Sequence, residues 1–185
     1  LPTIALLEKT LEVVHLDGGR DHRQRLLTLL PLYLVPADPA SEARMEGFFS
    51  ELAGSHPEPL PDVIEISGYR LQSRKRAPGL AWFDFSVLCG PQRSQVDYLH
   101  IARTCETVLL SGIPVLGPGQ AAEARRLTWL IDILYDYRVK LIASAACPPA
   151  GIYTAGEKAG EFVRTVSRLQ EMQTREYLDT PYESP

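Results

Sequence analysis

The spacing of apolar and polar positions changes along the chain and divides it into helical and strand-like stretches. Residues 2–10 predict a helix, because their leucine and isoleucine side chains recur at helical intervals. A short strand is expected over 11–16. The leucine-rich stretch 21–35 fits a helix or a strand, because Pro31 interrupts either one. A further helix is expected over 41–52.

Residues 62–88 carry a β pattern. DVIEIS alternates apolar and polar residues, YRLQSRKR continues as a second strand, and LAWFDFSVLC is aromatic and β-branched enough for a third. Pro78-Gly79 supplies a turn before that third stretch. Together these features predict a three-stranded antiparallel insertion.

From Arg93 onward, helices and strands alternate. Ser94 with Asp97 three positions later resembles a capping box and opens a helix that runs through Thr104. TVLLSGIPVL predicts an apolar strand, although a glycine and a proline interrupt it. This segment marks the beginning of an α/β region.

The second part of that region completes a strand, helix and strand unit. The stretch 121–138 predicts a helix and VKLIASA a second strand, which implies a right-handed crossover and two parallel strands buried on both faces. A last amphipathic helix is expected from about Glu161 to Tyr177. The apolar face of the first of these helices consists of Ala124, Leu127, Leu130, Ile131 and Leu134.

Composition places the chain among ordinary globular proteins, with 185 residues, 45% hydrophobic and 23% charged. The net charge of −4 excludes a broad basic field, so generic binding to nucleic acid or anionic membranes is not expected. Three widely spaced cysteines argue against a disulfide framework and favour a reducing compartment. No apolar run approaches the roughly 18 residues that span a bilayer, and the first residues lack the features expected of a secretory or transit signal. The chain is expected to begin within a fold.

Nucleotide-binding motifs are missing from the sequence. A P-loop ends in Gly-Lys-Ser/Thr, but the lysines at 9, 75, 140 and 158 follow Glu, Arg, Val and Glu. The sequence contains no Asp-Glu dipeptide for a Walker B motif, and GPGQ at 117–120 predicts a turn instead of a dinucleotide fingerprint. The chain alone is therefore expected to be inactive as a nucleotide hydrolase.

Other catalytic groups are weakly indicated. His100 and Cys105 are five residues apart on a predicted helix, which favours a packed thiol over a nucleophile. Asp132 and Asp136 share a helix face and offer acid–base chemistry, although an arginine-paired surface is the preferred interpretation. The run SRKR at 73–76 offers a contact for phosphate, although the solvated face of a β-hairpin is the preferred interpretation. No histidine has a metal-ligand partner at suitable spacing.

Arginine is the informative cation, with fifteen arginines against four lysines. Arg93 precedes a helix, Arg125 and Arg126 lie within one, and Arg164 and Arg168 are one turn apart. Planar guanidinium groups at such places suit bidentate recognition of phosphate or carboxylate. Taken singly, each is expected to form a surface ion pair.

A series of segments in this order resembles the carboxy-terminal half of the ZapE-like cell-division ATPases, known in mitochondria as ATPase-family-gene-one-like proteins. His22 stands where this family usually has Tyr in its Asp-Tyr-Arg motif. The segments are LPTI, LDGGRDHR, FDFSVLC, RSQVDYLHIA, IPV, EARRLTWLIDILYDYRVKLIASA and SRLQEMQTREYL.

The resemblance implies a partial P-loop AAA-type fold. Residues 1–59 would end the ATPase core and form a helical connection, 60–90 would form an antiparallel β insertion, and 91–185 an α/β carboxy-terminal region. The Walker motifs would precede this chain, and the complete protein would bind ATP and Mg²⁺. It would be a homo-oligomer in the bacterial cytoplasm or on the mitochondrial matrix side, at most peripherally attached to a membrane.

The resemblance also selects arginines. Arg126, Arg164 and Arg168 are candidates for a sensor or a trans-acting finger in catalysis, and Arg23 and Arg93 for nucleotide binding. Asp97 and Asp132 would orient such arginines.

Two further hypotheses remain beside the ATPase component. In the first, the region is a non-catalytic module whose β insertion docks division-ring or quality-control proteins. In the second, it is an independent enzyme that uses Cys105 or the pair Asp132 and Asp136.

Overall fold

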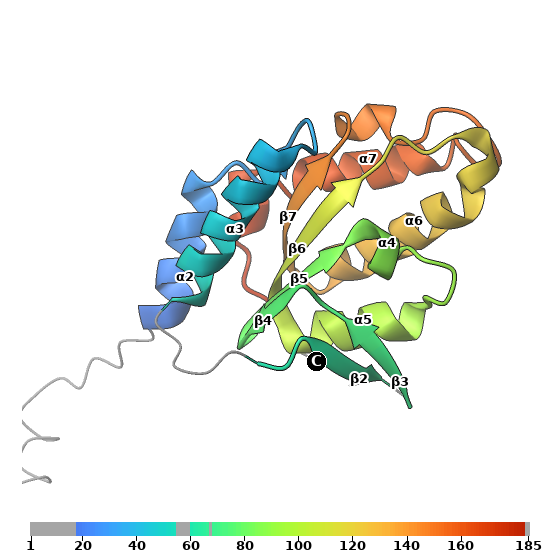
Figure 1. Cartoon of the computed structure of the whole chain (residues 1–185). Coiled ribbons are helices and arrows are strands. Elements are labelled where there is room, and N and C mark those ends of the chain that lie inside the picture. Colours follow the sequence, from blue (N-terminus) through green and yellow to red (C-terminus); the bar gives the residue numbers. More distant parts are fainter. Residues whose placement is uncertain (1–17, 55–59, 67, 184–185) are drawn as a thin grey trace, which may run out of the picture.

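A five-stranded sheet lies at the centre of this computed structural model, which describes residues 18–54, 60–66 and 68–183 (Figure 1). Four of its strands are parallel, and the edge strand β4 runs antiparallel to β5. The expected α/β class and the parallel strand, helix and strand unit are confirmed, and the sheet is consistent with part of a P-loop fold. The strands lie in the order β1 (Tyr33–Leu34), β7 (Lys140–Ala145), β6 (Cys105–Ile113), β5 (Gly79–Asp84) and β4 (Lys75–Ala77).

Helices cover both faces of the sheet (Figure 1). On one face lie α2 (Gly18–Leu29) and α3 (Pro39–Ala53), and on the other α5 (Gln95–Thr104) and α6 (Ala121–Asp136). Beside these helices, α7 packs against α6 and α8 against α2. The remaining helical elements are α4 (Phe85–Leu88), η1 (Pro118–Gln120), η2 (Pro149–Gly151), α7 (Phe162–Glu171) and α8 (Arg175–Asp179).

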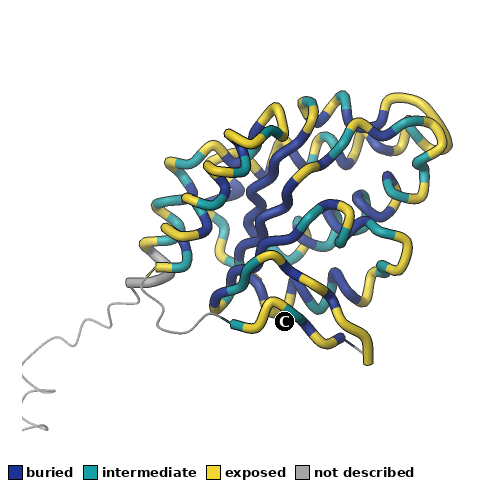
Figure 2. The backbone as a smooth tube through the Cα atoms, viewed as in Figure 1, coloured by how far each residue is buried: buried dark blue, intermediate teal, exposed yellow. Residues whose placement is uncertain are grey.

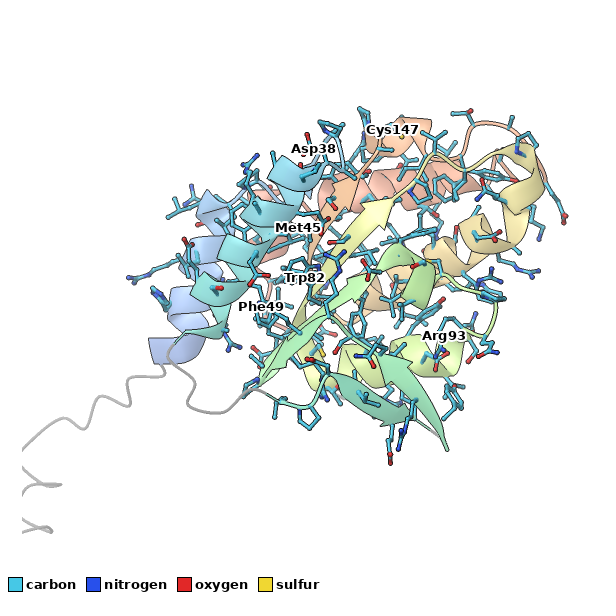
Figure 3. The ribbon with its side chains drawn as sticks, viewed as in Figure 1. Asp38, Met45, Phe49, Trp82, Arg93 and Cys147 are labelled. Atoms are coloured by element: carbon cyan, nitrogen blue, oxygen red, sulfur yellow. The ribbon has the colours of Figure 1, made fainter. Side chains whose placement is uncertain are left out.

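The central strands are buried on both sides (Figure 2). Leu109 of β6 and Ile142 of β7 pack into the cluster beneath α2 and α3, whereas Val108 and Leu141 join the cluster beneath α5 and α6. This alternation follows from the two-residue period of a strand. On the α3 side, Met45 and Phe49 face Trp82 of β5, and the Phe49 and Trp82 ring centroids are 6.1 Å apart (Figure 3).

Several sequence predictions are confirmed. The helix expected over 41–52 is α3, and the helix that ends at Thr104 is α5, where the Ser94 amide donates to Asp97 Oδ2 at 2.7 Å. The ambiguous stretch 21–35 contains the end of α2 and then β1, with Pro31 between them. The helix predicted over 2–10 and the strand over 11–16 lie outside the described residues. In α6 the predicted apolar face is buried, namely Ala124, Leu127, Leu130, Ile131 and Leu134.

The three-stranded antiparallel insertion was wrong in its strand pairing. Only β2 (Val63–Ile66) and β3 (Tyr69–Gln72) form a separate antiparallel hairpin. The second predicted strand is divided into β3 and β4, and the third is β5. The antiparallel pairing of these two stretches is confirmed for β4 and β5, but β5 also pairs in parallel with β6 inside the main sheet. Leu80 to Phe83 are all buried, as is typical of a parallel strand covered on both faces. The segment boundaries at 59/60 and 90/91 stay predictions.

The predicted carboxy-terminal helix is two helices. It breaks after α7 at residues 172–174, and Thr174 Oγ1 accepts the Tyr177 amide at 3.3 Å to begin α8. The turn expected at 117–120 contains η1. Among the described residues, no helix has both the length and the apolar character to cross a bilayer.

Lys140 fixes α8 to the amino end of the central strand β7. Its Nζ donates to the Tyr177 carbonyl oxygen at 2.9 Å and to the Thr180 carbonyl oxygen at 2.6 Å. The side chain lies 4.7 Å from the centroid of the Tyr177 ring and is 7% exposed. Burial, together with the nearby positive charge of Arg138, lowers the pKa of Lys140 to about 8.

This lowered pKa predicts a pH-dependent stability. Between about pH 8 and 10.5 the unfolded chain keeps the Lys140 proton that the folded chain has lost, so folding is favoured as the pH rises. The free energy of unfolding of the protein minus that of Lys140→Met should therefore increase by about 2–3 kcal/mol from pH 7.5 to 10.5. Urea unfolding of both proteins measures it, and a difference that stays constant with pH would contradict the prediction.

Candidate functional site

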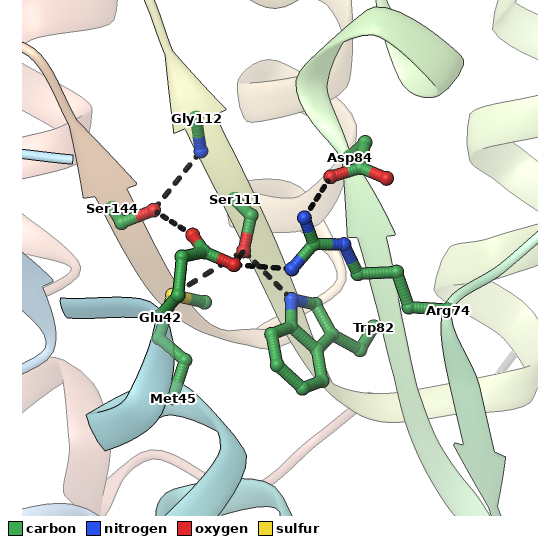
Figure 4. A network of polar contacts seen from close by, with 8 residues as sticks. All are labelled: Glu42, Met45, Arg74, Trp82, Asp84, Ser111, Gly112 and Ser144. Atoms are coloured by element: carbon green, nitrogen blue, oxygen red, sulfur yellow. Dashed lines mark hydrogen bonds and ion pairs between the residues drawn. The ribbon is translucent and has the colours of Figure 1, made fainter. Parts of the chain in front are cut away.

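Polar side chains gather at the carboxyl ends of the parallel strands (Figure 4). Asp84 ends β5, and Ser111 and Ser144 lie near the ends of β6 and β7. In open α/β sheets, ligands bind in the crevice outside this edge. A ligand-binding site is therefore expected at this edge of the sheet.

Glu42 of α3 lies over this edge and accepts hydrogen bonds from two serine hydroxyl groups. Ser111 Oγ and Ser144 Oγ each donate to the Glu42 carboxylate at 3.2 Å. Arg74 forms an ion pair with Glu42 and a second with Asp84, where Nη2 and Oδ1 are 2.7 Å apart (Figure 4). The guanidinium group thus neutralises two carboxylates that come from different elements.

Trp82 completes the network from within the sheet. Its Nε1 donates to Ser111 Oγ at 2.8 Å, and the Arg74 guanidinium lies 5.1 Å from its ring centroid. The Gly112 amide donates to Ser144 Oγ at 2.9 Å (Figure 4). Side chains of the protein itself therefore fill this part of the crevice and satisfy one another.

The run SRKR lies partly in a hairpin, as expected, because Lys75 and Arg76 belong to β4, which pairs antiparallel with β5, but its side chains are only partly solvated. Arg74 and Lys75 pair with acids of α3, Glu42 and Glu46, and Arg76 Nη1 donates to the Pro61 carbonyl oxygen at 3.1 Å. The run leads from the β2–β3 hairpin into the main sheet, where Arg74 and Lys75 contact the acidic side chains of α3.

The turn between β1 and α3 also holds a carboxylate where a nucleotide-binding sheet would hold phosphate. Asp38 Oδ1 accepts the Ser41 amide at 2.8 Å, and Pro39 has no amide hydrogen to offer. Asp38 lies at the same end of the sheet as Cys147, whose carbonyl oxygen accepts the Tyr33 hydroxyl at 3.0 Å (Figure 3). The described residues contain no group of three or more His, Cys, Asp or Glu side chains suited to a metal ion.

Arg23 and Arg126 are engaged with backbone carbonyl groups. Arg23 Nε donates to the Leu52 oxygen at 2.8 Å and its Nη1 to the Pro78 oxygen at 2.9 Å. Arg126 is 9% exposed and its Nε donates to the Cys89 oxygen at 2.7 Å. These contacts tie helices to neighbouring elements, and the nucleotide-related roles expected of both arginines stay predictions.

Arg93 joins the hairpin to α5 (Figure 3). Its guanidinium lies 5.8 Å from the Tyr69 ring centroid and 3.9 Å from Asp97 Oδ1. Tyr69 Oη donates to the same buried carboxylate at 2.7 Å. Arg93 Nη1 is buried without a hydrogen-bond partner among the described residues, so Asp97 contacts this arginine as expected but leaves one donor unused.

Arg164 and Arg168 both approach Asp132, although they are held differently. Arg168 Nη1 lies 2.6 Å from Asp132 and its Nη2 3.4 Å from Asp136, and its guanidinium is 4.6 Å from the Tyr135 ring centroid. Arg164 is 3.8 Å from Asp132, and 66% of its side chain is exposed. Of the five candidate arginines, the structure brings together only this pair.

Nucleophilic chemistry by Cys105 has little support. The residue begins β6, is 3% exposed, and burial raises the pKa of its thiol. Asp132 and Asp136 are paired with Arg168, as the preferred interpretation expected. The network around Glu42 was missed, because its members lie up to 102 positions apart in the sequence.

Replacing Arg74 tests how much its positive charge contributes to the stability of the network around Glu42. Arg74→Met is expected to lower the free energy of unfolding by about 1–2 kcal/mol, because Glu42 and Asp84 lose their shared cation. Added Mn²⁺ should restore part of this loss, because carboxylate and hydroxyl oxygens are ligands for hard cations. Chemical unfolding with and without Mn²⁺ measures both effects.

The matched control is Lys75→Met, which removes a neighbouring cation from a more exposed pair with Glu46. It should change stability by less than about 0.5 kcal/mol and gain nothing from Mn²⁺. Equal losses of unfolding free energy in Arg74→Met and Lys75→Met, with equal recovery in Mn²⁺, would contradict the prediction.

Comparisons with known proteins agree with the resemblance seen in the sequence. Cell division protein ZapE of Escherichia coli (strain K12) is 37% identical over 178 residues, which are 96% of this chain and 47% of ZapE. Lactation elevated protein 1 homolog B of Danio rerio is 30% identical over 211 residues, with 96% and 42% covered. The chain spans about half the length of the curated relatives it matches, and no solved structure matches it. Because residues 1–181 match the model of the AFG1-like ATPases, the chain belongs to the AFG1-like ATPase family.

Proposed function

We propose that this chain is the carboxy-terminal part of an ATPase whose Walker motifs lie outside these 185 residues. Membership of an ATPase family and coverage of about half of each relative support this assignment. ATP and Mg²⁺ would be bound by the P-loop half, because this sequence has no Gly-Lys pair and its described residues have no suitable acidic cluster. The chain would be inactive alone.

Arg164 is the residue that we assign to the nucleotide phosphates. Its side chain is 66% exposed, and its contact with Asp132 is long. A surface pair of this kind contributes about 0–1 kcal/mol, so little is lost when the guanidinium turns to a phosphate. Arginines that stabilise charge on a transferred phosphoryl group act in this way, from the same chain or from a neighbouring copy.

Arg168 is assigned a positioning role beneath Arg164. Its close pair with Asp132 and its stacking on Tyr135 hold α7 against α6. Arg126, which is fixed to the Cys89 carbonyl oxygen, would support α6 in the same way. The exposure of Arg164 beside this fixed pair is the observation that carries the assignment.

Substitution of Arg164 tests the assignment in a polypeptide that joins this chain to its P-loop half. Arg164→Gln is expected to reduce kcat for ATP hydrolysis by at least about 100-fold with unchanged thermal stability, because a phosphate-directed charge is lost. Steady-state turnover and thermal unfolding measure the two quantities. Arg175→Gln, which removes another exposed arginine, is the control and should hydrolyse ATP normally.

Arg168→Gln separates positioning from direct contact. It should lower the unfolding temperature as well as turnover, because Asp132 and Asp136 lose their partner. Unchanged turnover in Arg164→Gln would remove Arg164 from the reaction, whereas a loss of stability equal to that of Arg168→Gln would make its role structural.

The same proposal includes the setting of the complete protein. Similarity to a cell division protein supports a role in cell division. On the family resemblance, the complete protein would be a homo-oligomer that works with division-ring proteins in the bacterial cytoplasm. A mitochondrial relative would act on the matrix side in protein quality control. The net charge of −4 supports partners other than nucleic acid and at most a peripheral contact with membranes.

The hairpin β2–β3 favours a second function, the docking of a partner protein. It forms a sheet of its own, and Glu65 and Arg70 project from it with 77% and 78% of their side chains exposed. Tyr69 holds the hairpin against α5 through its bond to Asp97. Deletion of 62–88 would not test this function, because it would remove β5 from the main sheet.

A charge swap tests docking without disturbing the fold. The double variant Glu65→Arg with Arg70→Glu keeps the ion pair and reverses the charge at each position. It should abolish cosedimentation with assembled division-ring protein and leave ATP hydrolysis unchanged. The same swap at Glu46 and Lys75 is the control and should bind normally; loss of hydrolysis with intact binding would contradict the docking function.

A further inference from the structure

A cavity of about 560 Å³ lies between α6 and the segment 153–162 that leads into α7. This volume is within the range of small-molecule and peptide side-chain sites. Small residues from the start of α6, such as Ala122, leave the space open, and Trp129 forms a half-buried wall. Tyr153 and Phe162, packed edge to face with their centroids 5.7 Å apart, form the floor.

Hydrogen bonds made by residues of its own walls hold the cavity in shape. Tyr153 Oη donates to the Glu157 carbonyl oxygen at 2.9 Å, which closes the loop on one side. The Thr128 and Thr165 hydroxyl groups, 2.9 Å apart, join α6 to α7 on the other. Gly156 has a φ of +123°, and a Cβ there would lie 2.3 Å from Tyr153 Oη, so the loop requires glycine at this position.

The charges at the cavity are divided between its two walls. Arg125 lies with its guanidinium 5.2 Å from the Trp129 ring centroid, and no carboxylate of the described residues forms a salt bridge with it. On the opposite wall, Lys158 and Glu161 pair with each other at 3.9 Å. Arg125 is therefore the cavity cation without a carboxylate partner among the described residues, and Glu157 also lines the cavity.

We propose that this cavity binds a segment of a partner protein in which an acidic residue adjoins a bulky apolar residue. The acidic side chain pairs with Arg125 in the bidentate manner that guanidinium groups favour. The apolar side chain enters between Trp129 and Tyr153, and a backbone amide of the segment donates to Glu157. A nucleotide, whose phosphates would pair with the same arginine, is the competing occupant that the experiment distinguishes. The proposal goes beyond the ATPase function and does not depend on it.

Blocked dipeptides test the chemistry of the cavity directly. The probes are Ac-Asp-Phe-NH₂, Ac-Asn-Phe-NH₂ and Ac-Lys-Phe-NH₂, with AMP as a nucleotide probe. The chain has two tryptophans, and Trp82 is 3% exposed, so the indole NMR resonance of Trp129 reports on the cavity. Ac-Asp-Phe-NH₂ should shift this resonance saturably and bind about tenfold more tightly than the Asn peptide.

Two variants, each with a control, separate the contribution of the Arg125 charge from that of the cavity volume. Arg125→Gln should abolish the preference for the Asp peptide and keep weak binding of all three peptides, whereas Arg103→Gln, at an exposed arginine of α5, should keep the preference. Ala122→Trp fills the cavity from an exposed helix position and should abolish binding. Ala43→Trp, at an exposed position of α3, is its control.

The proposal is overturned if the Asp peptide does not bind saturably, or if it binds no better than the Asn peptide. It is also overturned if Arg125→Gln keeps the preference, or if AMP binds more tightly than the Asp peptide. Should Ala122→Trp fail to fold, the Arg125→Gln and Arg103→Gln pair still decides the outcome. Because no probe requires ATP hydrolysis, failure here is distinguishable from failure of the ATPase function.

Discussion

The burial of β6 and β7 on both faces is the constraint on which the rest of the structure depends. Two helical layers meet these strands, so every side chain along their middle is enclosed by apolar neighbours. Unpaired polar groups are costly in such surroundings and are therefore confined to the strand ends. Ser144 and Lys140, at opposite ends of β7, each belong to a set of hydrogen bonds that satisfies them.

The same constraint divides the arginines into two kinds. Arg74 and Arg126 complete buried or half-buried polar networks, where loss of the guanidinium leaves Asp84 without its cation or the Cys89 carbonyl oxygen without this donor. Arg125 and Arg164 stay at the surface of α6 and α7 and have weaker contacts. An arginine whose guanidinium is held by protein acceptors is not free to bind a ligand. The ligand-binding roles are therefore assigned to Arg125 and Arg164.

The sequence predicted what depends on local periodicity. The face of α6 and the apolar strand β7 follow from residue spacing alone, and both were identified with nearly correct bounds. The antiparallel pairing of β5 with the preceding stretch was right for β4. Its parallel pairing with β6 was not predicted, because a local pattern of apolar residues does not identify a partner strand further along the chain. The network around Glu42 was not predicted, because its contacts with Ser111 and Ser144 join residues 69 and 102 positions apart.

The phosphate-directed arginine and the cavity proposed above both lie at α7. This helix packs on α6 and η2 and buries Phe162 and Leu169 in the core, whereas the Arg164 side chain is 66% exposed. Phe162 at its start forms the floor of the cavity, and Arg164 is two residues further on. A segment bound in the cavity therefore contacts the same helical turn that presents Arg164. A ligand shifts a conformational equilibrium only when it binds one conformation more tightly than the other. If the bound segment favoured one position of this helical turn, it would also change the position of Arg164.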